Sequence, residues 1–256
     1  MAEFKEVMGT IGKAMVAAGV FVGKKAVEGY NFVDPDLRRH IFQTPLLAHT
    51  LIIPRTESIT VREDDGHNPI IFVHGMGGNR GNFYLMSKYL SYHGRKRSYM
   101  IHFPGGLSTS EMASRLKTFI DEVKDVTGRD KVDIVAHSLG GLVVRLAIAD
   151  FDLGDSITKL VTLGTPHKGT FPARFATAQK IMDLRPGSPF IERLDKSGIP
   201  ENVKCYSFWS SSDLFILPPE SAILDNSKVI EADKFTHYSY ILSPESWVNV
   251  AKVLEE

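Results

Sequence analysis

The sequence has a single cysteine, no net charge and no long apolar run, and each absence excludes a class of protein. The one cysteine, Cys205, rules out an internal disulfide, and its strand-like surroundings at 203–209 predict burial as a small hydrophobe. Because 30 basic residues balance 30 acidic residues, nothing in the charge indicates nucleic acid as a partner. HExxH and Cys/His ligand spacings are also absent, so we expect no metal and no cofactor.

The apolar stretch at 14–23 resembles a targeting signal but is a poor one. It is far shorter than the roughly 20 apolar residues that a membrane-spanning helix needs. Glu3 and Glu6 lie where a signal peptide carries basic charge. We therefore expect neither a cleaved signal peptide nor a transmembrane helix, which favours a cytoplasmic or peripherally membrane-associated protein.

The first residues instead predict an amphipathic helix with one apolar seam. Its apolar residues alternate at spacings of four and three: Phe4, Met8, Ile11, Met15, Ala18 and Val22. Interior glycines destabilise such a helix by roughly 1 kcal/mol each relative to alanine, so it needs a surface to pack on. That surface is the chain's own body, a second subunit in a homodimer, or a lipid interface.

No repeat or flexible linker divides the rest of the chain, so we expect an N-terminal extension at 1–60 and one α/β domain at 61–256. Strands are predicted at 51–53, 59–61, 69–73, 98–103, 131–136, 159–163, 203–209 and 228–232. Helices are predicted at 82–92, 108–127 (opening on Ser110), 139–147 and 247–254. This alternation predicts a mostly parallel sheet with helices on both faces, whose sites lie at the carboxyl ends of the strands.

The strongest motif is Ala136-His137-Ser138-Leu139-Gly140, set between a predicted strand and a predicted helix. It fits a nucleophile elbow, a turn so tight that the residues two before and two after the serine must be small. The turn lifts the Ser138 hydroxyl to the positive end of the following helix, which stabilises developing negative charge. The alternative is an ordinary strand-to-helix turn with a serine cap.

A glycine-rich loop, His74-Gly75-Met76-Gly77-Gly78, follows the first buried strand. Its glycines allow backbone amides to face a cavity, and a tetrahedral intermediate of acyl transfer needs two such amides. We assign them to Met76 and to Leu139, the residue after the nucleophile. A phosphate-binding loop is the alternative, but no Gly-Lys-Ser/Thr follows.

A serine nucleophile needs a base, and the base needs an acid that orients it. In the fold that carries this elbow, the chain order is serine, acid, histidine, which leaves His167 and His237 as bases. His167 suits a loop wall, whereas His237 lies just beyond the last predicted strand and is favoured. The other histidines before the elbow, His40, His49, His67, His93 and His102, are expected to be surface or structural residues.

For the acid we favour Asp213, which directly follows the penultimate strand and so falls at its carboxyl end. The alternatives are Asp225 and Glu220, one loop later, and Asp233, which is nearer to His237 in sequence. Any of these carboxylates is equally compatible with a solvated surface position, as most carboxylates are.

Together these motifs resemble those of the small bacterial lipases and esterases of the α/β-hydrolase superfamily. The motifs that carry the resemblance are 73–78, the alanine-led elbow at 136–141, the run 163–170, Ser212-Asp213 and His237. The resemblance spans roughly 68–256. It implies an α/β-hydrolase fold and hydrolysis of a small-molecule or lipid ester by a Ser138, Asp213 and His237 triad, with oxyanion amides from Met76 and Leu139.

The segment 171–194 is the only candidate for a lid, and we expect one short helix and a loop at the rim of an acyl pocket. So small a lid favours esters of short- or medium-chain acids. Residues expected to contact the substrate are His74, Gly75, Phe171, Leu214, Phe215 and Ile216. A thioesterase, phospholipase or polyester hydrolase would share these motifs, and a non-catalytic lipid- or partner-binding module is the alternative of another class.

Overall fold

The computed structural model describes residue 43, residues 59–175 and residues 178–256 of the chain. The amphipathic helix expected at 4–22 and the strand expected at 51–53 lie outside the described residues. The division of the chain into 1–60 and 61–256 therefore stays a prediction.

The described residues form one parallel sheet with helices on both faces, which confirms the predicted architecture. Its strands are β1 Ile70–Val73, β2 Ser98–Met100, β3 Val132–His137, β4 Ile157–Leu163, β5 Lys204–Trp209 and β6 Lys228–Glu231. They lie in the order β2-β1-β3-β4-β5-β6, and each neighbouring pair is parallel. The chain thus runs outward from β1 to β2, then returns past β1 to β3. The reversal creates a switch point between β1 and β3, where parallel sheets of this kind bind ligands beyond the carboxyl ends of the strands.

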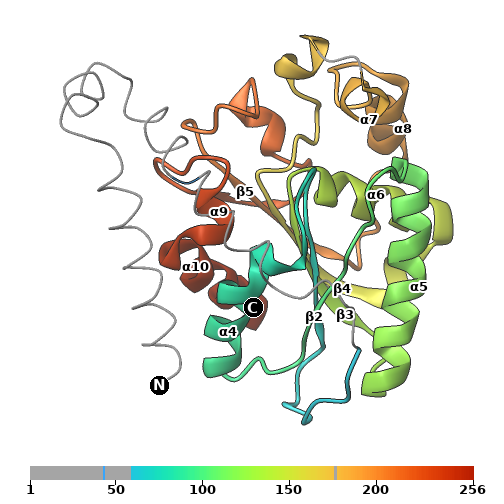
Figure 1. Ribbon diagram of the computed structural model, residues 1–256, viewed down its shortest axis with the longest axis vertical. Helices are drawn as coiled ribbons and strands as arrows, with labels where there is room; N and C mark the ends of the chain where they lie inside the picture. Colours follow the sequence, from blue (N-terminus) through green and yellow to red (C-terminus); the bar gives the residue numbers. More distant parts are fainter. Residues whose placement is uncertain (1–42, 44–58, 176–177) are drawn as a thin grey trace.

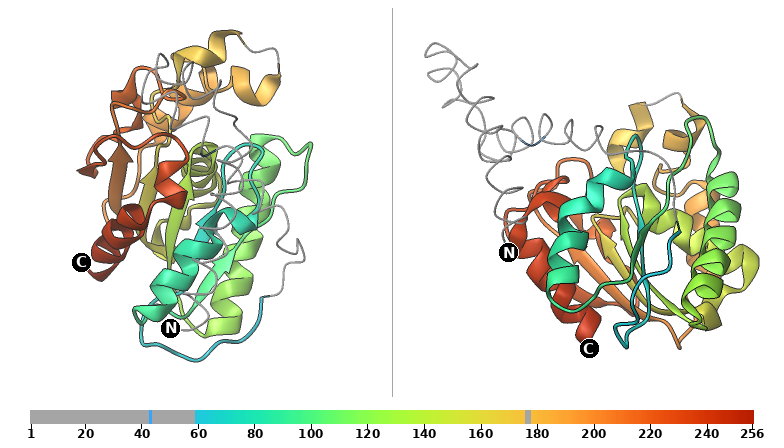
Figure 2. Two further views of the ribbon diagram at one scale, coloured as in Figure 1. Left: turned by 60° about the vertical axis from the view of Figure 1, so that its left-hand side comes forward. Right: turned by 60° about the horizontal axis from the view of Figure 1, so that its bottom comes forward.

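Helices cover the two faces of the sheet in separate layers (Figure 1). One layer contains α5 Thr109–Thr127, α6 Leu139–Phe151 and α8 Pro189–Ser197, and the other contains α4 Tyr84–Tyr92, α9 Ser239–Leu242 and α10 Pro244–Glu255. Figure 2 shows the sheet between α5 and the pair α4 and α10 in a second orientation.

The two layers follow from the alternation of side chains along each strand. In β1, Ile71 and Val73 join the core under α5 and α6, while Ile70 and Phe72 join the core under α4 and α10. All four side chains are completely buried. A strand buried on both faces reads as a continuous apolar run, which is why this one was recognisable in the sequence.

Several boundaries differ from the predictions for local reasons. Residues 59–61 form no strand. Helix α5 is capped by Ser108 rather than opening on Ser110, because the Ser108 hydroxyl accepts from the Glu111 amide while the Glu111 carboxylate accepts from the Ser108 amide. The short helix α9 was not predicted, and α10 begins at Pro244, before the predicted start at 247.

The predicted lid contains more helix than expected. It comprises the 3-10 helix η4 Phe171–Phe175, the short helix α7 Gln179–Met182 and α8, which extends beyond residue 194. Ile191 and Leu194 of α8 are buried in the core shared with α6. An ion pair of 3.0 Å between Arg145 of α6 and Asp195 fixes α8 further. The C-terminal part of the segment is thus built into the body of the fold.

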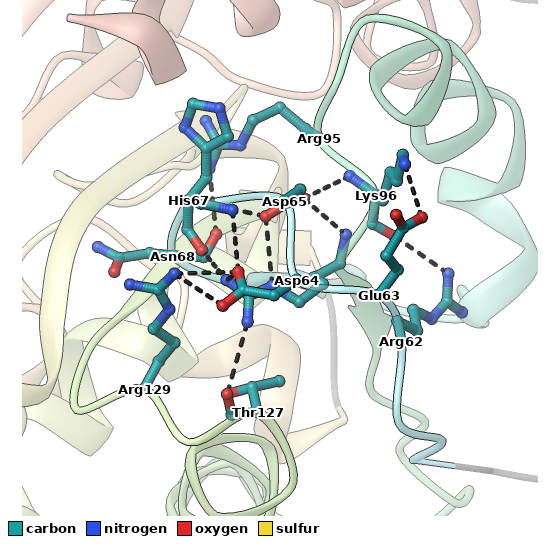
Figure 3. Close-up of polar contacts among 12 residues, drawn as sticks. Arg62, Glu63, Asp64, Asp65, His67, Asn68, Arg95, Lys96, Thr127 and Arg129 are labelled. Atoms are coloured by element: carbon teal, nitrogen blue, oxygen red, sulfur yellow. Dashed lines mark hydrogen bonds and ion pairs between the residues drawn. The ribbon is translucent and has the colours of Figure 1, made fainter.

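The amino ends of the strands are joined by charged side chains (Figure 3). Arg95, which precedes β2, donates from Nη2 to Asp133 Oδ2 of β3 at 2.7 Å and from Nη1 to the Leu254 carbonyl of α10 at 3.1 Å. Asp65 accepts from the His67 and Lys96 amides at 3.1 and 2.6 Å. These contacts stabilise the fold at the amino ends of the strands, whereas the predicted site lies at their carboxyl ends.

Among the described residues, no helix is both long enough and apolar enough to cross a membrane.

Candidate active site

The predicted elbow and the glycine-rich loop emerge side by side from the sheet. Val73, the last residue of β1, pairs with Ala136 of β3. The loop at 74–78 and the turn at Ser138 therefore both begin at the switch point between these two strands. Sequence positions about sixty residues apart are brought to one place by the strand order.

Ser138 has the strained backbone that a nucleophile elbow requires. Its φ is 54° and its ψ is −128°, a region that side-chain-bearing residues rarely occupy. It is half-buried and directly precedes α6, whose first amides have no partner within the helix. The serine hydroxyl is thereby presented at the positive end of a helix dipole.

The small residues around the elbow are required by backbone contacts. A Cβ on Gly140 would lie 2.6 Å from the Val73 carbonyl oxygen and 2.8 Å from that of His74. A Cβ on Gly75 would lie 2.8 Å from the Ser138 Cβ. The turn and the glycine-rich loop are thus in direct contact, and only glycine fits between them.

His237 and Asp213 are hydrogen-bonded to each other, with 2.9 Å between Nδ1 and Oδ2. Both side chains are buried, with 6% and 1% of their surfaces exposed. Because a carboxylate only accepts, Nδ1 of His237 carries the proton and Nε2 keeps its lone pair. That is the tautomer in which a histidine acts as a base through Nε2.

A backbone amide orients the Asp213 carboxylate toward His237. Its Oδ1 accepts from the Phe215 amide at 2.9 Å, which leaves Oδ2 for His237. Gly164, with φ of 54°, allows a close approach, since a Cβ there would lie 3.1 Å from Oδ2 and 2.6 Å from the Tyr240 ring. Burial, and then the nearby Asp213 charge, raise the pKa of Tyr240 well above its usual value. Tyr240 therefore stays a neutral wall of the site.

The two predicted oxyanion amides belong to residues with suitable local geometry. The Gly75 carbonyl accepts from the Gly78 amide at 3.1 Å, closing a turn whose central residues are Met76 and Gly77. Such a turn uses the amide of its last residue, so the Met76 amide is not consumed by it. Leu139 is the first residue of α6, and its amide is one of those without a helical partner.

Among the interactions of the described residues, none joins the alternative base, His167, to His237 or Asp213. His167 is completely buried, and its Nε2 lies 3.0 Å from the Thr162 hydroxyl. Burial, followed by the charges of Arg145 and Lys168, lowers its pKa well below the usual value. Its contacts are those of a residue that stabilises the loop after β4.

The alternative acids are on the surface. Asp225 and Asp233 are exposed, and they pair with Lys168 at 2.7 Å and with Lys234 at 3.3 Å. Glu220 is exposed in the 3-10 helix η5 Pro219–Ala222. Of the four candidate carboxylates, Asp213 is the one with a hydrogen bond to His237 among the described contacts.

The residues expected to contact substrate divide into an exposed and a buried set. Phe171, Leu214 and Phe215 are exposed, and the Phe215 ring lies 5.0 Å from the His237 ring between centroids. His74, Gly75 and Ile216 are buried. The His74 ring accepts from the Phe103 amide through Nε2 at 3.2 Å and therefore donates through Nδ1 to the Gly75 carbonyl at 2.9 Å. His74 thus fastens the glycine-rich loop.

Two further residues contact the His237 region and were not singled out from the sequence. His137 lies 2.8 Å from the His237 carbonyl oxygen through its Nε2. The Gln43 amide nitrogen donates to the Ser239 hydroxyl at 3.0 Å, and its amide oxygen accepts from Thr236. Neither contact leaves a local sequence signal, since the partners are 100 and nearly 200 residues away.

Other reactive groups do not form a second centre within the described part of the chain. No three histidine, cysteine, aspartate or glutamate residues there are grouped as metal ligands would be. Cys205 is half-buried in β5, and burial raises its pKa to about 11, so its thiol stays protonated.

The sheet order and the strained turn after β3 are those of the α/β hydrolase fold. The model of the α/β hydrolase fold family matches residues 68–185. Triacylglycerol lipases from Pseudarthrobacter phenanthrenivorans and Burkholderia plantarii are 31% identical to this chain over 116 residues, or 42% of its length. The matched parts make up 35% and 32% of those lipases, so the chain spans about a third of the curated relatives it matches.

Solved structures show the same fold. The mature form of the lipase BlEst2 from Bacillus licheniformis superposes with a TM-score of 0.65 at 19% identity, covering 77% of this chain and 96% of that one. At that identity the likeness concerns the fold alone. The chain thus has the α/β hydrolase fold, and part of its sequence is similar to triacylglycerol lipases.

Proposed function

We propose that this protein hydrolyses carboxylic esters by acyl transfer, with Ser138 as nucleophile, His237 as base and Asp213 as the orienting acid. The observation that carries the proposal is the buried hydrogen bond of 2.9 Å between His237 and Asp213, in a fold whose strained elbow carries Ser138. A buried aspartate that accepts from a histidine at the carboxyl ends of the strands can keep the histidine ring in the orientation and tautomer of a general base.

In the first half of the reaction, Ser138 Oγ attacks the ester carbonyl and its proton passes to Nε2 of His237. The carbonyl oxygen becomes an oxyanion, which accepts from the Met76 and Leu139 amides. His237 then donates the proton to the leaving alcohol as the ester bond breaks. An acyl group remains on Ser138.

In the second half, His237 takes a proton from water, and the resulting hydroxide attacks the acyl carbon. The tetrahedral intermediate collapses, Ser138 recovers its proton from His237 and the carboxylic acid leaves. Asp213 stays ionised throughout and stabilises the imidazolium that forms in each half.

We propose short- or medium-chain esters as substrates. Support comes from the exposed apolar side chains Phe171, Leu214 and Phe215, the last of which lies against the His237 ring. Support also comes from α8, which is packed into the core instead of forming a large separate cap. The relatives named as triacylglycerol lipases make lipid esters the second group to assay.

The proposal is tested by comparing the full-length chain with the variant Ser138→Ala on p-nitrophenyl esters of increasing acyl length. We expect kcat to fall on the order of 10⁴- to 10⁶-fold, because the nucleophile and base act as a unit. A fluorophosphonate probe should label the wild type at Ser138 and leave the variant unlabelled. Comparable turnover by the variant would refute Ser138 as the nucleophile.

A further inference from the structure

His137 is the last residue of β3 and directly precedes the proposed nucleophile, yet acyl transfer as described gives it no task. Only 6% of its surface is exposed. Burying an imidazole requires hydrogen-bond partners for its ring nitrogens. The partner that His137 contacts is the main chain of His237.

The direction of that hydrogen bond is fixed by chemistry. Nε2 of His137 lies 2.8 Å from the His237 carbonyl oxygen, and a carbonyl only accepts. Nε2 therefore carries the proton. The two imidazole rings lie against each other, with 4.6 Å between their centroids and 47° between their planes.

The His137 ring is also neutral. Burial lowers its pKa well below the usual value, repulsion from a protonated His237 or His74 ring lowers it further, and the bond to the His237 carbonyl opposes this. A neutral ring adds no charge repulsion when its neighbour His237 becomes an imidazolium. His137 thus remains a hydrogen-bond donor without acting as a competing base.

We propose that His137 is a positioning residue that holds the main chain of His237 at a fixed distance from Ser138. Because His137 is bonded covalently to Ser138, its one hydrogen bond ties the nucleophile's turn directly to the loop between β6 and α9. Asp213 orients the ring of His237 through Nδ1, and His137 fixes the backbone from which that ring extends. This inference rests on the proposed function of the site.

The size of the effect follows from the sensitivity of catalysis to geometry. A displacement of about 1 Å at a reacting group costs on the order of 10²-fold in rate. Losing the bond to His137 should therefore lower kcat strongly, while KM changes little, since His137 is buried and does not contact the substrate.

The test compares His137→Leu, which removes the donor at similar size, with His137→Gln, whose amide nitrogen can donate to the same carbonyl. We expect His137→Leu to lower kcat about 10- to 100-fold with KM within about twofold of wild type, and His137→Gln to recover most of the loss. His167→Leu is the matched control, because it removes another buried histidine, whose ring bonds to Thr162 and has no described hydrogen bond to His237 or Asp213. The control should lower the melting temperature and leave kcat near the wild-type value.

Equal losses of kcat in His137→Leu and His137→Gln would overturn the positioning role, and so would unchanged kcat in His137→Leu.

The failure of the proposed function is a separate outcome, seen when the wild type neither hydrolyses esters nor reacts with a fluorophosphonate. Positioning is then decided by the ring nitrogen resonances of His237 in spectra of ¹⁵N-histidine-labelled protein. They should shift in His137→Leu and return in His137→Gln, and unchanged resonances in His137→Leu overturn the inference.

Discussion

At the scale of single residues, the candidate site depends on hydrogen bonds that set which atom carries a proton. Asp213 accepts from Nδ1 of His237, and this leaves Nε2 as the basic atom. His137 has the opposite tautomer, with the proton on Nε2, because its partner is a carbonyl oxygen. Two adjacent imidazoles are thus kept in different protonation patterns by their acceptors.

The hydrogen bond between Asp213 and His237 predicts different effects for substitutions of Asp213 and Asp225, the two aspartates between which the sequence left the choice of acid open. Asp213→Asn should lower kcat on the order of 10³- to 10⁴-fold, since an amide in place of the carboxylate stabilises the wrong tautomer of His237. Asp225→Asn removes only an exposed partner of Lys168 and should leave kcat near wild type. Steady-state kinetics on one ester checks both, and a larger loss in Asp225→Asn would reverse the assignment.

At the scale of elements, the elbow between β3 and α6 is tight because α6 begins against the backbone of the loop after β1. The Val73 and His74 carbonyls occupy the space that a side chain at residue 140 would need. A strained Ser138 backbone is tolerated because the strand and the helix on either side are buried and cannot relax.

Gly140→Ala should therefore destabilise the fold by about 1–3 kcal/mol, the usual cost of overpacking, despite alanine's better helix propensity. Esterase activity should fall as well, because the displaced backbone carries Ser138. Gly105→Ala is the matched control, since a Cβ there meets nothing within 4 Å. Urea denaturation of both variants gives the comparison. Equal stability of the two would show that the backbone of the elbow can shift to accommodate a Cβ at residue 140.

At the scale of the whole molecule, the two ends of the sheet have different tasks. The carboxyl end carries the strained turn and the candidate site, whereas the amino end is closed by ion pairs (Figure 3). Arg95 joins the segment before β1, strand β3 and the end of α10 through bonds to Asn68, Asp133 and Leu254. It is a single side chain that connects distant parts of the sequence.

Arg95→Met should lower the free energy of unfolding by about 3–5 kcal/mol at neutral pH, because it leaves the buried Asp133 carboxylate without its partner. Lys96→Met, which removes an exposed partner of Glu63, is the control and should have little effect. Guanidinium unfolding curves measure both. Equal stability of Arg95→Met and wild type would show that solvent reaches Asp133.

The same variant predicts a dependence on pH. Burial raises the pKa of Asp133 in the folded protein, while Arg95 and then Lys159 hold it down. Without Arg95 the folded pKa rises further above the unfolded value, so the folded state binds more protons as the pH falls between the two values. The deficit of Arg95→Met should accordingly shrink at acidic pH, measured by unfolding at several pH values, and a deficit that grows would contradict this account.

The parallel sheet and its helices could be predicted from the sequence, because buried strands and amphipathic helices have local periodic patterns. It also singled out the serine turn, since that turn demands small residues at fixed positions. Even so, local patterns assigned the opening of α5 to Ser110 instead of its cap Ser108 and missed α9, because caps and short helices depend on individual hydrogen bonds.

Which distant side chains meet could not be predicted from local patterns and required the three-dimensional structure. The choice of Asp213 over Asp225, Glu220 and Asp233 as the partner of His237 required the arrangement of the loops after β5 and β6. The contact of His137 with the His237 carbonyl spans 100 residues and has no signature in either segment. Periodicity depends on residues that are close together in the sequence. A hydrogen bond between loops depends on strand order, which no local pattern encodes.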